Sequence, residues 1–246
     1  MSLIQKIENN LETLQNKNYE IKEIDFLPSN DNLSSRKAYK VDVCALYIEL
    51  RGANDLDISN WEESIQLVHQ LIIDPVYQIL EEHEGKLVST PGNGILALWT
   101  TNKANINHAV KAAMTINWLL NVKYQFNKKF PKFDFGIAIH HGAALAIKTQ
   151  IPGGEFDEEE IKYISPIINI AQSMSNQLSF PKTIGISYDV YERLYDESIK
   201  VKKSFVLIPY QKKIWEDGKI KFKDLSYKIK TTAHHLDYQS QSIDKV

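Results

Sequence analysis

The sequence of 246 residues is poor in cysteine, glycine and proline, and it carries no excess of either charge. Its single cysteine, Cys44, excludes a disulfide framework and a cysteine-based zinc site. With 29 basic and 31 acidic residues the formal net charge is −2, which gives no electrostatic basis for general binding to nucleic acid or to a membrane surface. No apolar run reaches the ~20 residues of a membrane span. These absences predict a soluble protein of the reducing cytoplasm.

The residues that are present predict one main domain with two extensions. Hydrophobic residues make up 43% of the chain, which is enough for a full core. Apolar spacing predicts an N-terminal helix followed by a polar connection over residues 1–39, and the start of the chain is unlike a signal peptide. Residues 40–210 form the expected domain, and residues 211–246 form a basic and aromatic extension.

Within the domain, hydrophobic periodicity and turn residues predict alternating strands and helices. The expected strands are 41–50, 86–90, 94–100, 133–146, 183–187 and 199–208. The expected helices are 2–16, 61–72, one that begins at Asp74-Pro75, 104–127, 166–178 and 189–195. An acidic loop is expected over 152–160, and a last hairpin around Asp217-Gly218. This order predicts an α+β fold of the βαβ-βαβ type, with helices on one face of a mainly antiparallel sheet.

Two short segments place a polar residue where an apolar strand meets a tight glycine turn. The first is Leu46–Gly52, with Glu49 at the junction, and the second is Pro91–Trp99, with Asn93 between two glycines. Asn-Gly is a favoured turn pair, so a purely conformational reason for Asn93 is also open.

Four stretches of this sequence resemble the class III adenylate and guanylate cyclase catalytic domain over about residues 40–210. They are Leu46–Gly52, Gly92–Trp99, Phe135–Gly142 and Tyr163–Ala171. The last, with the pattern Tyr-x-Ser-Pro-x-x-Asn-x-Ala, is similar to a bacterial subgroup that includes the uridylate and cytidylate cyclases of the Pycsar anti-phage system. The resemblance implies the ferredoxin-like cyclase domain and a lyase reaction that forms a 3′,5′-cyclic nucleotide.

The resemblance also implies a metal site, and here the sequence departs from the family pattern. Members of the family hold two divalent ions, Mg²⁺ or Mn²⁺, between two aspartates at the positions of Glu49 and Asn93. Glu49 keeps the charge but adds a methylene group. Asn93 offers one neutral carbonyl oxygen and cannot bridge two cations. A degenerate metal site is therefore expected, with Mg²⁺ or Mn²⁺ needed only if the protein is active.

Further positions follow from the resemblance. In a head-to-tail homodimer, an asparagine and an arginine four residues later stabilise the transition state. Asn169 matches the first, and Ser173 stands where the arginine would be, a loss that commonly costs 10²–10³-fold in rate. The turn formed by Arg51, Gly52 and Ala53 is expected to bind phosphates through its backbone.

Base recognition is expected to differ from that of purine cyclases. The two base-reading positions hold Ser89 and Lys162, which cannot form the usual lysine and aspartate pair for adenine. A pyrimidine is therefore the favoured base. Lys162 is equally compatible with a solvated loop residue.

Three hypotheses remain open at this point. The favoured one is a pseudo-cyclase of a cyclic-nucleotide defence system that dimerises, with itself or with a related cyclase subunit, binds a nucleoside triphosphate and turns over slowly or not at all. The second is an active cyclase that converts UTP or CTP to cUMP or cCMP and pyrophosphate. The third is a protein-interaction module on the cyclase fold that binds no nucleotide.

Overall fold

The computed structural model describes residues 20–34, 37–51, 68–89, 94–123, 134–150, 159–204 and 210–234, together with residues 2, 4, 5 and 66. Contacts between residues divide the chain into two units. The smaller comprises Met1–Val41 and Leu145–Ile164, and the larger comprises Asp42–Ala144 and Ser165–Val246. Two long strands, β2 (Lys37–Arg51) and β5 (Asp134–Gln150), contribute residues to both.

The smaller unit is built on one end of each long strand. Strand β1 (Glu20–Ile24) pairs in parallel with the start of β2, and β6 (Glu159–Ile164) pairs antiparallel with the end of β5. A short 3₁₀ helix, η1 (Asn30–Asn32), lies between β1 and β2 in the chain. The small core of this unit contains Leu33, Tyr39 and Ala146, with Ile24, Ile161 and Tyr163 partly buried against them.

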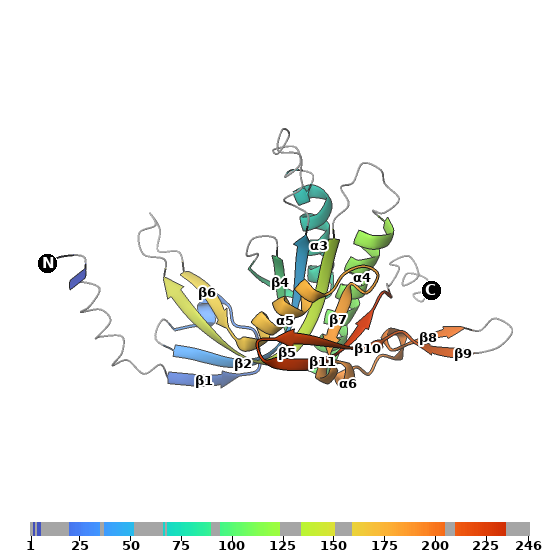
Figure 1. Ribbon diagram of the computed structural model, residues 1–246. Coiled ribbons are helices and arrows are strands. Elements are labelled where there is room, and N and C mark those ends of the chain that lie inside the picture. Colours follow the sequence, from blue (N-terminus) through green and yellow to red (C-terminus); the bar gives the residue numbers. More distant parts are fainter. Residues whose placement is uncertain are drawn as a thin grey trace, which may run out of the picture. The chain divides into compact units, whose positions relative to one another are not determined.

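The larger unit contains a sheet with the strand order β10-β11-β7-β5-β2-β4-β3 (Figure 1). Strands β2 and β4 are antiparallel, as are β3 and β4, β10 and β11, and β11 and β7, whereas β5 and β7 are parallel. The sheet is therefore mainly antiparallel, as expected. The remaining strands are β3 (Lys86–Ser89), β4 (Gly94–Thr100), β7 (Ile184–Ser187), β10 (Glu216–Phe222) and β11 (Leu225–Thr232).

The helices begin where local signals predict. Asn102 accepts a hydrogen bond from the Asn105 amide at the start of α4, and Ser165 accepts one from the Ile167 amide at the start of α5, where Pro166 occupies the first turn. The described α-helices are α3 (Asp74–Glu82), α4 (Lys103–Asn117), α5 (Pro166–Gln177) and α6 (Tyr188–Arg193). A π-helical turn, η4 (His69–Ile73), precedes α3, and another, η5 (Trp118–Lys123), follows α4. A 3₁₀ turn, η6 (Glu197–Ile199), follows α6.

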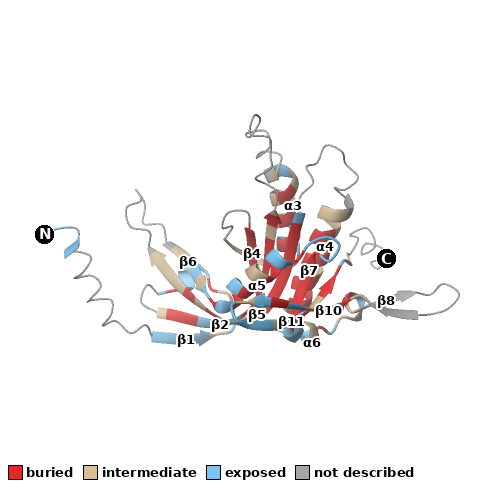
Figure 2. Ribbon diagram, in the orientation of Figure 1, coloured by how far each residue is buried: buried red, intermediate tan, exposed pale blue. Residues whose placement is uncertain are grey.

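The helices lie on both faces of the sheet, which differs from the single helical face expected from the sequence. Ile137 and Ile139 of β5 share the main core with α3, α4 and α6. Ala138, between them, belongs instead to a second core with Ile170 and Met174 of α5. Because successive strand residues point to opposite faces, α5 covers the face opposite to the other helices. Figure 2 shows the buried residues concentrated in the central strands between these layers.

The last hairpin forms, but its turn is not at Asp217-Gly218, so that prediction is wrong. Gly218 lies inside β10 opposite Ile229, and the turn is at Lys223 and Asp224, where Lys223 has a φ of 53°. Strand β11 then pairs with β7 and extends the sheet. A separate pair of strands, β8 (Val201–Ser204) and β9 (Tyr210–Lys213), precedes this hairpin.

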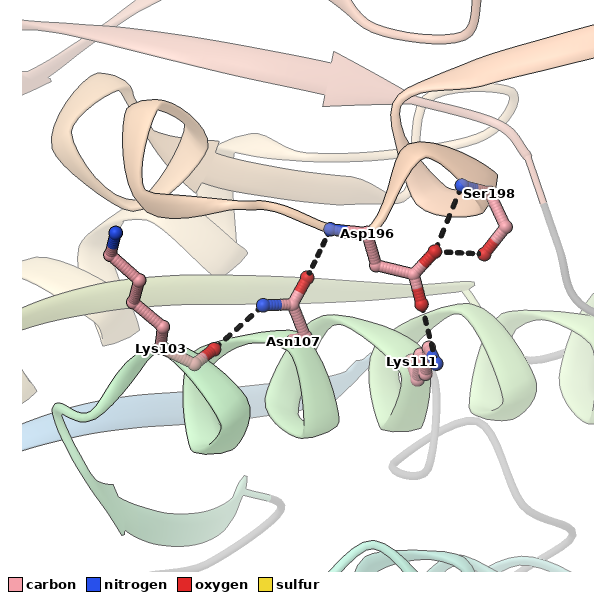
Figure 3. Close-up of polar contacts among 5 residues, drawn as sticks. All are labelled: Lys103, Asn107, Lys111, Asp196 and Ser198. Carbon is pink, nitrogen blue, oxygen red and sulfur yellow. Dashed lines mark hydrogen bonds and ion pairs between the residues drawn. The ribbon is translucent and has the colours of Figure 1, made fainter.

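A polar cluster joins α4 to the segment after α6 (Figure 3). Lys111 lies 2.6 Å from one carboxylate oxygen of Asp196, and Ser198 donates its amide and its hydroxyl to the other oxygen at 2.9 and 2.6 Å. Asn107 accepts from the Asp196 amide at 3.2 Å and donates to the Lys103 carbonyl at 2.6 Å. Burial by itself would raise the pKa of Asp196, but the hydrogen bonds from Lys111 and Ser198 outweigh it and lower the pKa.

Several expectations fall on residues that the structure does not describe. These include most of the N-terminal helix over 2–16 and most of the acidic loop over 152–160. The division at residues 39 and 210 stays a prediction. In the described part of the chain, no helix has both the length and the apolar character needed to cross a bilayer.

Candidate functional site

The end of β2 places Glu49 next to the start of β4. In the antiparallel register Glu49 lies opposite Gly94, the residue that follows Asn93 in the sequence. Glu49 is half-buried. Asn93, Gly52 and Ala53 lie outside the described residues, so their predicted roles stay predictions.

Tyr47 organises the surroundings of Glu49. The tyrosine is 1% exposed, and because strand residues alternate it shares a face of β2 with Glu49, two residues later. Its hydroxyl accepts a hydrogen bond from the Gln172 amide at 3.0 Å. A side-chain Cβ at Gly94 would lie 2.1 Å from the hydroxyl oxygen, so the glycine leaves the space that Tyr47 fills.

The environment of Tyr47 keeps its hydroxyl protonated. Burial, followed by the nearby charge of Glu49, raises the pKa of Tyr47 to about 12. At neutral pH the hydroxyl is therefore a hydrogen-bond donor. Sequence reasoning did not assign a role to Tyr47, although the alternation of strand residues could have placed it beside Glu49.

Helix α5 carries the two positions expected to stabilise a transition state. Asn169 is exposed on this helix. Ser173, one turn later, is bonded within its own chain, because its hydroxyl lies 3.4 Å from the Lys221 carbonyl of β10. Gln177 strengthens the same contact: its amide donates to the Lys221 carbonyl at 2.8 Å and its carbonyl accepts from the Lys221 amide at 3.1 Å. This part of α5 thus holds the final hairpin.

Arg51, expected at a phosphate-binding turn, has a side chain that is engaged elsewhere. Its Nε lies 2.8 Å from the Asp134 carboxylate, and its terminal nitrogens donate to the carbonyls of Ser175, at 3.0 Å, and Leu178. These carbonyls are at the C-terminus of α5, where a positive charge is favourable. A phosphate contact at this turn therefore remains a prediction for the backbone of residues 51–53.

The two expected base-reading positions lie in different units. Ser89 ends β3 of the larger unit, opposite Leu96 of β4. Lys162 lies in β6 of the smaller unit, where it is exposed and forms an ion pair with Glu160 at 2.6 Å. Base recognition by these two residues stays a prediction.

The adjacent histidines of β5 do not form a metal centre in the described residues. His140 is 9% exposed, and its ring centroid lies 6.3 Å from that of Tyr227. Burial, with a smaller effect of His141, lowers the pKa of His140 to about 4, so it is neutral at pH 7. Among the residues that the structure describes, no three histidine, cysteine or acidic side chains are grouped to hold a metal ion.

The donors that the sequence supplies at these two positions differ from those that the resemblance implies for two divalent ions. The resemblance requires two carboxylates there, and this chain supplies one carboxylate at Glu49 and a neutral carboxamide at Asn93.

Comparison with known proteins gives a consistent result. No protein-family model matches the chain. A uridylate cyclase from Gulbenkiania mobilis is 25% identical over 197 residues, which cover 74% of this chain and 75% of that protein. The crystal structure of a guanylyl cyclase is similar with a TM-score of 0.62 and 17% identity, over 81% of this chain and 95% of that one.

A second structural match is to a protein that is described as cyclase-like and as ATP-binding. A class III adenylyl cyclase-like ATP-binding protein from Pseudomonas aeruginosa has a TM-score of 0.59 and 16% identity, over 80% of this chain and 44% of that one. The two structural matches establish the fold, and the uridylate cyclase adds similarity in sequence. The chain therefore has the fold of the class III nucleotide cyclases, and its sequence is similar to that of a uridylate cyclase.

Proposed function

We propose that this protein is a nucleotide-binding pseudo-cyclase, which binds a nucleoside triphosphate and cyclises it slowly or not at all. The observation that carries the proposal is the state of Ser173. At the position expected for a charge-stabilising arginine, the chain has a short hydroxyl that lies 3.4 Å from the Lys221 carbonyl of its own β10. A serine in that contact cannot supply the positive charge that a developing phosphorane requires.

The metal positions support the same proposal. Glu49 and Asn93 together carry one negative charge where a two-ion site needs two. Binding of nucleotide does not require either change to be reversed, because Asn169 is exposed on α5 and Glu49 is half-buried at the end of β2.

The similarity to a uridylate cyclase also supports a pyrimidine as the preferred base. From the resemblance to the Pycsar subgroup we also propose an anti-phage setting in the cytoplasm. The partner in this proposal is a second copy of the chain or a related cyclase subunit. In either arrangement α5 of one subunit would face the β2 end of the other, as the family resemblance implies.

Product analysis tests the proposal. Purified protein is incubated with ATP, GTP, CTP and UTP in Mn²⁺, and 3′,5′-cyclic products are measured by mass spectrometry, while calorimetry measures binding of the same nucleotides. We expect binding with little or no product. The matched variant carries Asn93→Asp and Ser173→Arg, which restore the two missing charges, and it should form more product than the wild type. Robust turnover by the wild type would contradict the proposal.

The similarity to uridylate cyclase favours one alternative, an active cyclase that forms cUMP or cCMP. Glu49 would then be the principal ligand for Mg²⁺ or Mn²⁺, Asn93 the auxiliary one, and Asn169 would orient the sugar or phosphate. A single cyclic pyrimidine product from the wild type, lost in Glu49→Ala, would establish this alternative in place of the pseudo-cyclase.

A further inference from the structure

Strand β10 lies at one edge of the sheet in the described part of the chain (Figure 1). Gln177 shows which of its backbone groups point outward: the side-chain amide donates to the Lys221 carbonyl at 2.8 Å, and the side-chain carbonyl accepts from the Lys221 amide at 3.1 Å. In an antiparallel pair the outward-pointing residues alternate along the strand. Lys219, two residues before Lys221, therefore also directs its N–H and C=O away from β11. No hydrogen bond among the described residues uses these two groups of Lys219.

A groove runs along this edge, between β10 and the segment that joins α5 to β7. Its volume is about 360 Å³, and it is lined by residues 177–182, 218–220, 229 and 231. The contact of Gln177 with Lys221 closes one end, and an ion pair of Lys182 with Glu216 connects the two sides near the start of β10. The volume is at the lower end of the range for binding sites, which suits a few side chains.

The groove combines an apolar surface with unpaired backbone groups. Leu178 and Ile220 are buried along it, whereas Phe180 is 65% exposed. Ile220 packs with α5, so the side of β10 that carries Gly218 and Ile220 is the α5 side. Lys219 lies between them and directs its side chain to the other face, so it lines the groove with its main chain.

The other face of the same hairpin is basic. Lys219 lies directly opposite Lys228 of β11, and Lys221 lies on the same face of β10 as Lys219. All three are exposed, and none of the ion pairs in the described part of the chain involves them. Like charges directly opposite each other are unfavourable, and a negative charge beside them would relieve the repulsion.

We propose that the outer edge of β10 binds an extended segment of an acidic partner protein, which adds to the sheet as a further strand. Its backbone pairs with the N–H and C=O of Lys219, in the mode known as β-strand addition. Alternate side chains of such a segment point to opposite faces. The apolar ones enter the groove beside Phe180, and the acidic ones lie beside Lys219 and Lys221. This interaction surface does not depend on nucleotide binding.

Fluorescence anisotropy with the full-length protein tests the proposal. The probe is a fluorescein-labelled heptapeptide in which valine and glutamate alternate. One control peptide has N-methylated amides and cannot pair with a strand, and another has lysine in place of glutamate. We expect the valine–glutamate peptide to bind and each control to bind about tenfold more weakly or less, as is typical of the loss of two hydrogen bonds or of a favourable charge.

Two substitutions locate the binding site. Phe180→Ala removes an exposed side chain of the groove and should weaken peptide binding several-fold. Tyr195→Ala is its matched control, because Tyr195 is 58% exposed in the same unit and does not line the groove. Lys219→Glu should weaken binding of the valine–glutamate peptide and strengthen binding of the valine–lysine peptide, a reversal that a general loss of folding cannot produce.

The remaining outcomes would overturn the proposal. Equal binding of the N-methylated peptide would show that no strand is added, and equal effects of Phe180→Ala and Tyr195→Ala would show that the groove is not the site. Sedimentation with and without the peptide identifies the other occupant: a dimer that the peptide dissociates would mean that a second copy of this chain covers the edge. If the full-length protein binds none of the peptides, the proposal is wrong, whatever its nucleotide binding.

Discussion

The polar cluster after α6 and the relay at the end of β2, which consists of Gln172, Tyr47 and Glu49, are built from the same kinds of group but differ in how the carboxylate is paired. Each combines a carboxylate with a side-chain amide and connects a helix to another element. In the first, Asp196 has donors on both oxygens, from Lys111 and from Ser198. In the second, the Tyr47 hydroxyl accepts from the Gln172 amide, and Glu49 lies two residues later on the same face of β2 and is half-buried.

The difference distinguishes a structural cluster from a candidate binding site. A carboxylate whose oxygens are both paired has little capacity for a ligand, and its loss should be felt in stability. A half-buried carboxylate at the end of a strand is accessible to a ligand, and its loss should be felt in binding. The predictions below separate these two consequences.

Lowering the pH should produce the largest loss of stability. The groups responsible are two buried histidines that belong to neither cluster. Burial lowers the pKa of His83 and of His140 from 6.5 to about 4 in each case. A folded-state pKa below the unfolded value means that the unfolded chain binds more protons between the two values. Stability is therefore complete above about pH 6.5 and falls as the pH drops toward 4, by an amount on the order of a few kcal/mol. Urea unfolding at a series of pH values measures this loss.

Neither Asp196 nor Tyr47 changes charge in the same pH window. The hydrogen bonds of Asp196 lower its pKa, and the pKa of Tyr47 is raised to about 12, so neither group titrates between pH 6.5 and 4. A variant with His140→Asn should lose part of the pH dependence. An unchanged slope in that variant would show that His140 is not responsible.

A methyl group at Gly94 should produce the next largest effect, within the relay. In Gly94→Ala the new Cβ would lie 2.1 Å from the Tyr47 hydroxyl oxygen, so the buried tyrosine must move. We expect a loss of about 2–3 kcal/mol in the free energy of unfolding, as for an overpacked core, together with weaker nucleotide binding. Chemical denaturation and calorimetry measure the two effects.

Gly218→Ala is the matched control for this change. Its Cβ would lie 3.2 Å from the nearest atom, on Ile229, and the neighbouring side chain needs to move by only a few tenths of an ångström. A smaller loss of stability and unchanged binding are expected. If the two variants behave alike, the close approach of Tyr47 to Gly94 is not what sets the size of the effect.

Local sequence signals predicted most of the elements that carry the site. Alternating apolar residues placed the strands on either side of the Asn93 turn, and Asp74-Pro75 and Ser165-Pro166 marked the starts of α3 and α5. The turn of the last hairpin was misplaced because Asp217-Gly218 is a favourable turn pair. Pairing of β11 with β7 instead leaves Gly218 inside β10, a long-range constraint that the local pattern does not contain.

The contacts within the site could not be predicted in the same way. Tyr47 and Gln172 are 125 residues apart in the chain, and a tyrosine in an apolar strand looks like an ordinary core residue. Their contact depends on α5 packing on the face of the sheet opposite to the other helices. Arg51 is a similar case, because its bonds to the α5 carbonyls of Ser175 and Leu178 exist only after that packing.

The smallest expected effects test the comparison most directly, because the substitution in one cluster should change stability and the substitution in the other should change nucleotide binding. Asp196→Asn removes the charge that Lys111 contacts at 2.6 Å, and it should lower the free energy of unfolding by about 1–2 kcal/mol with no change in nucleotide binding. Tyr47→Phe should cost about 1 kcal/mol or less, because the half-buried Glu49 and Gln172 can bind water, and yet it should weaken binding. Urea unfolding and calorimetry on both variants give the four values. If Asp196→Asn weakened binding as much as Tyr47→Phe, the two clusters would not be separate in function.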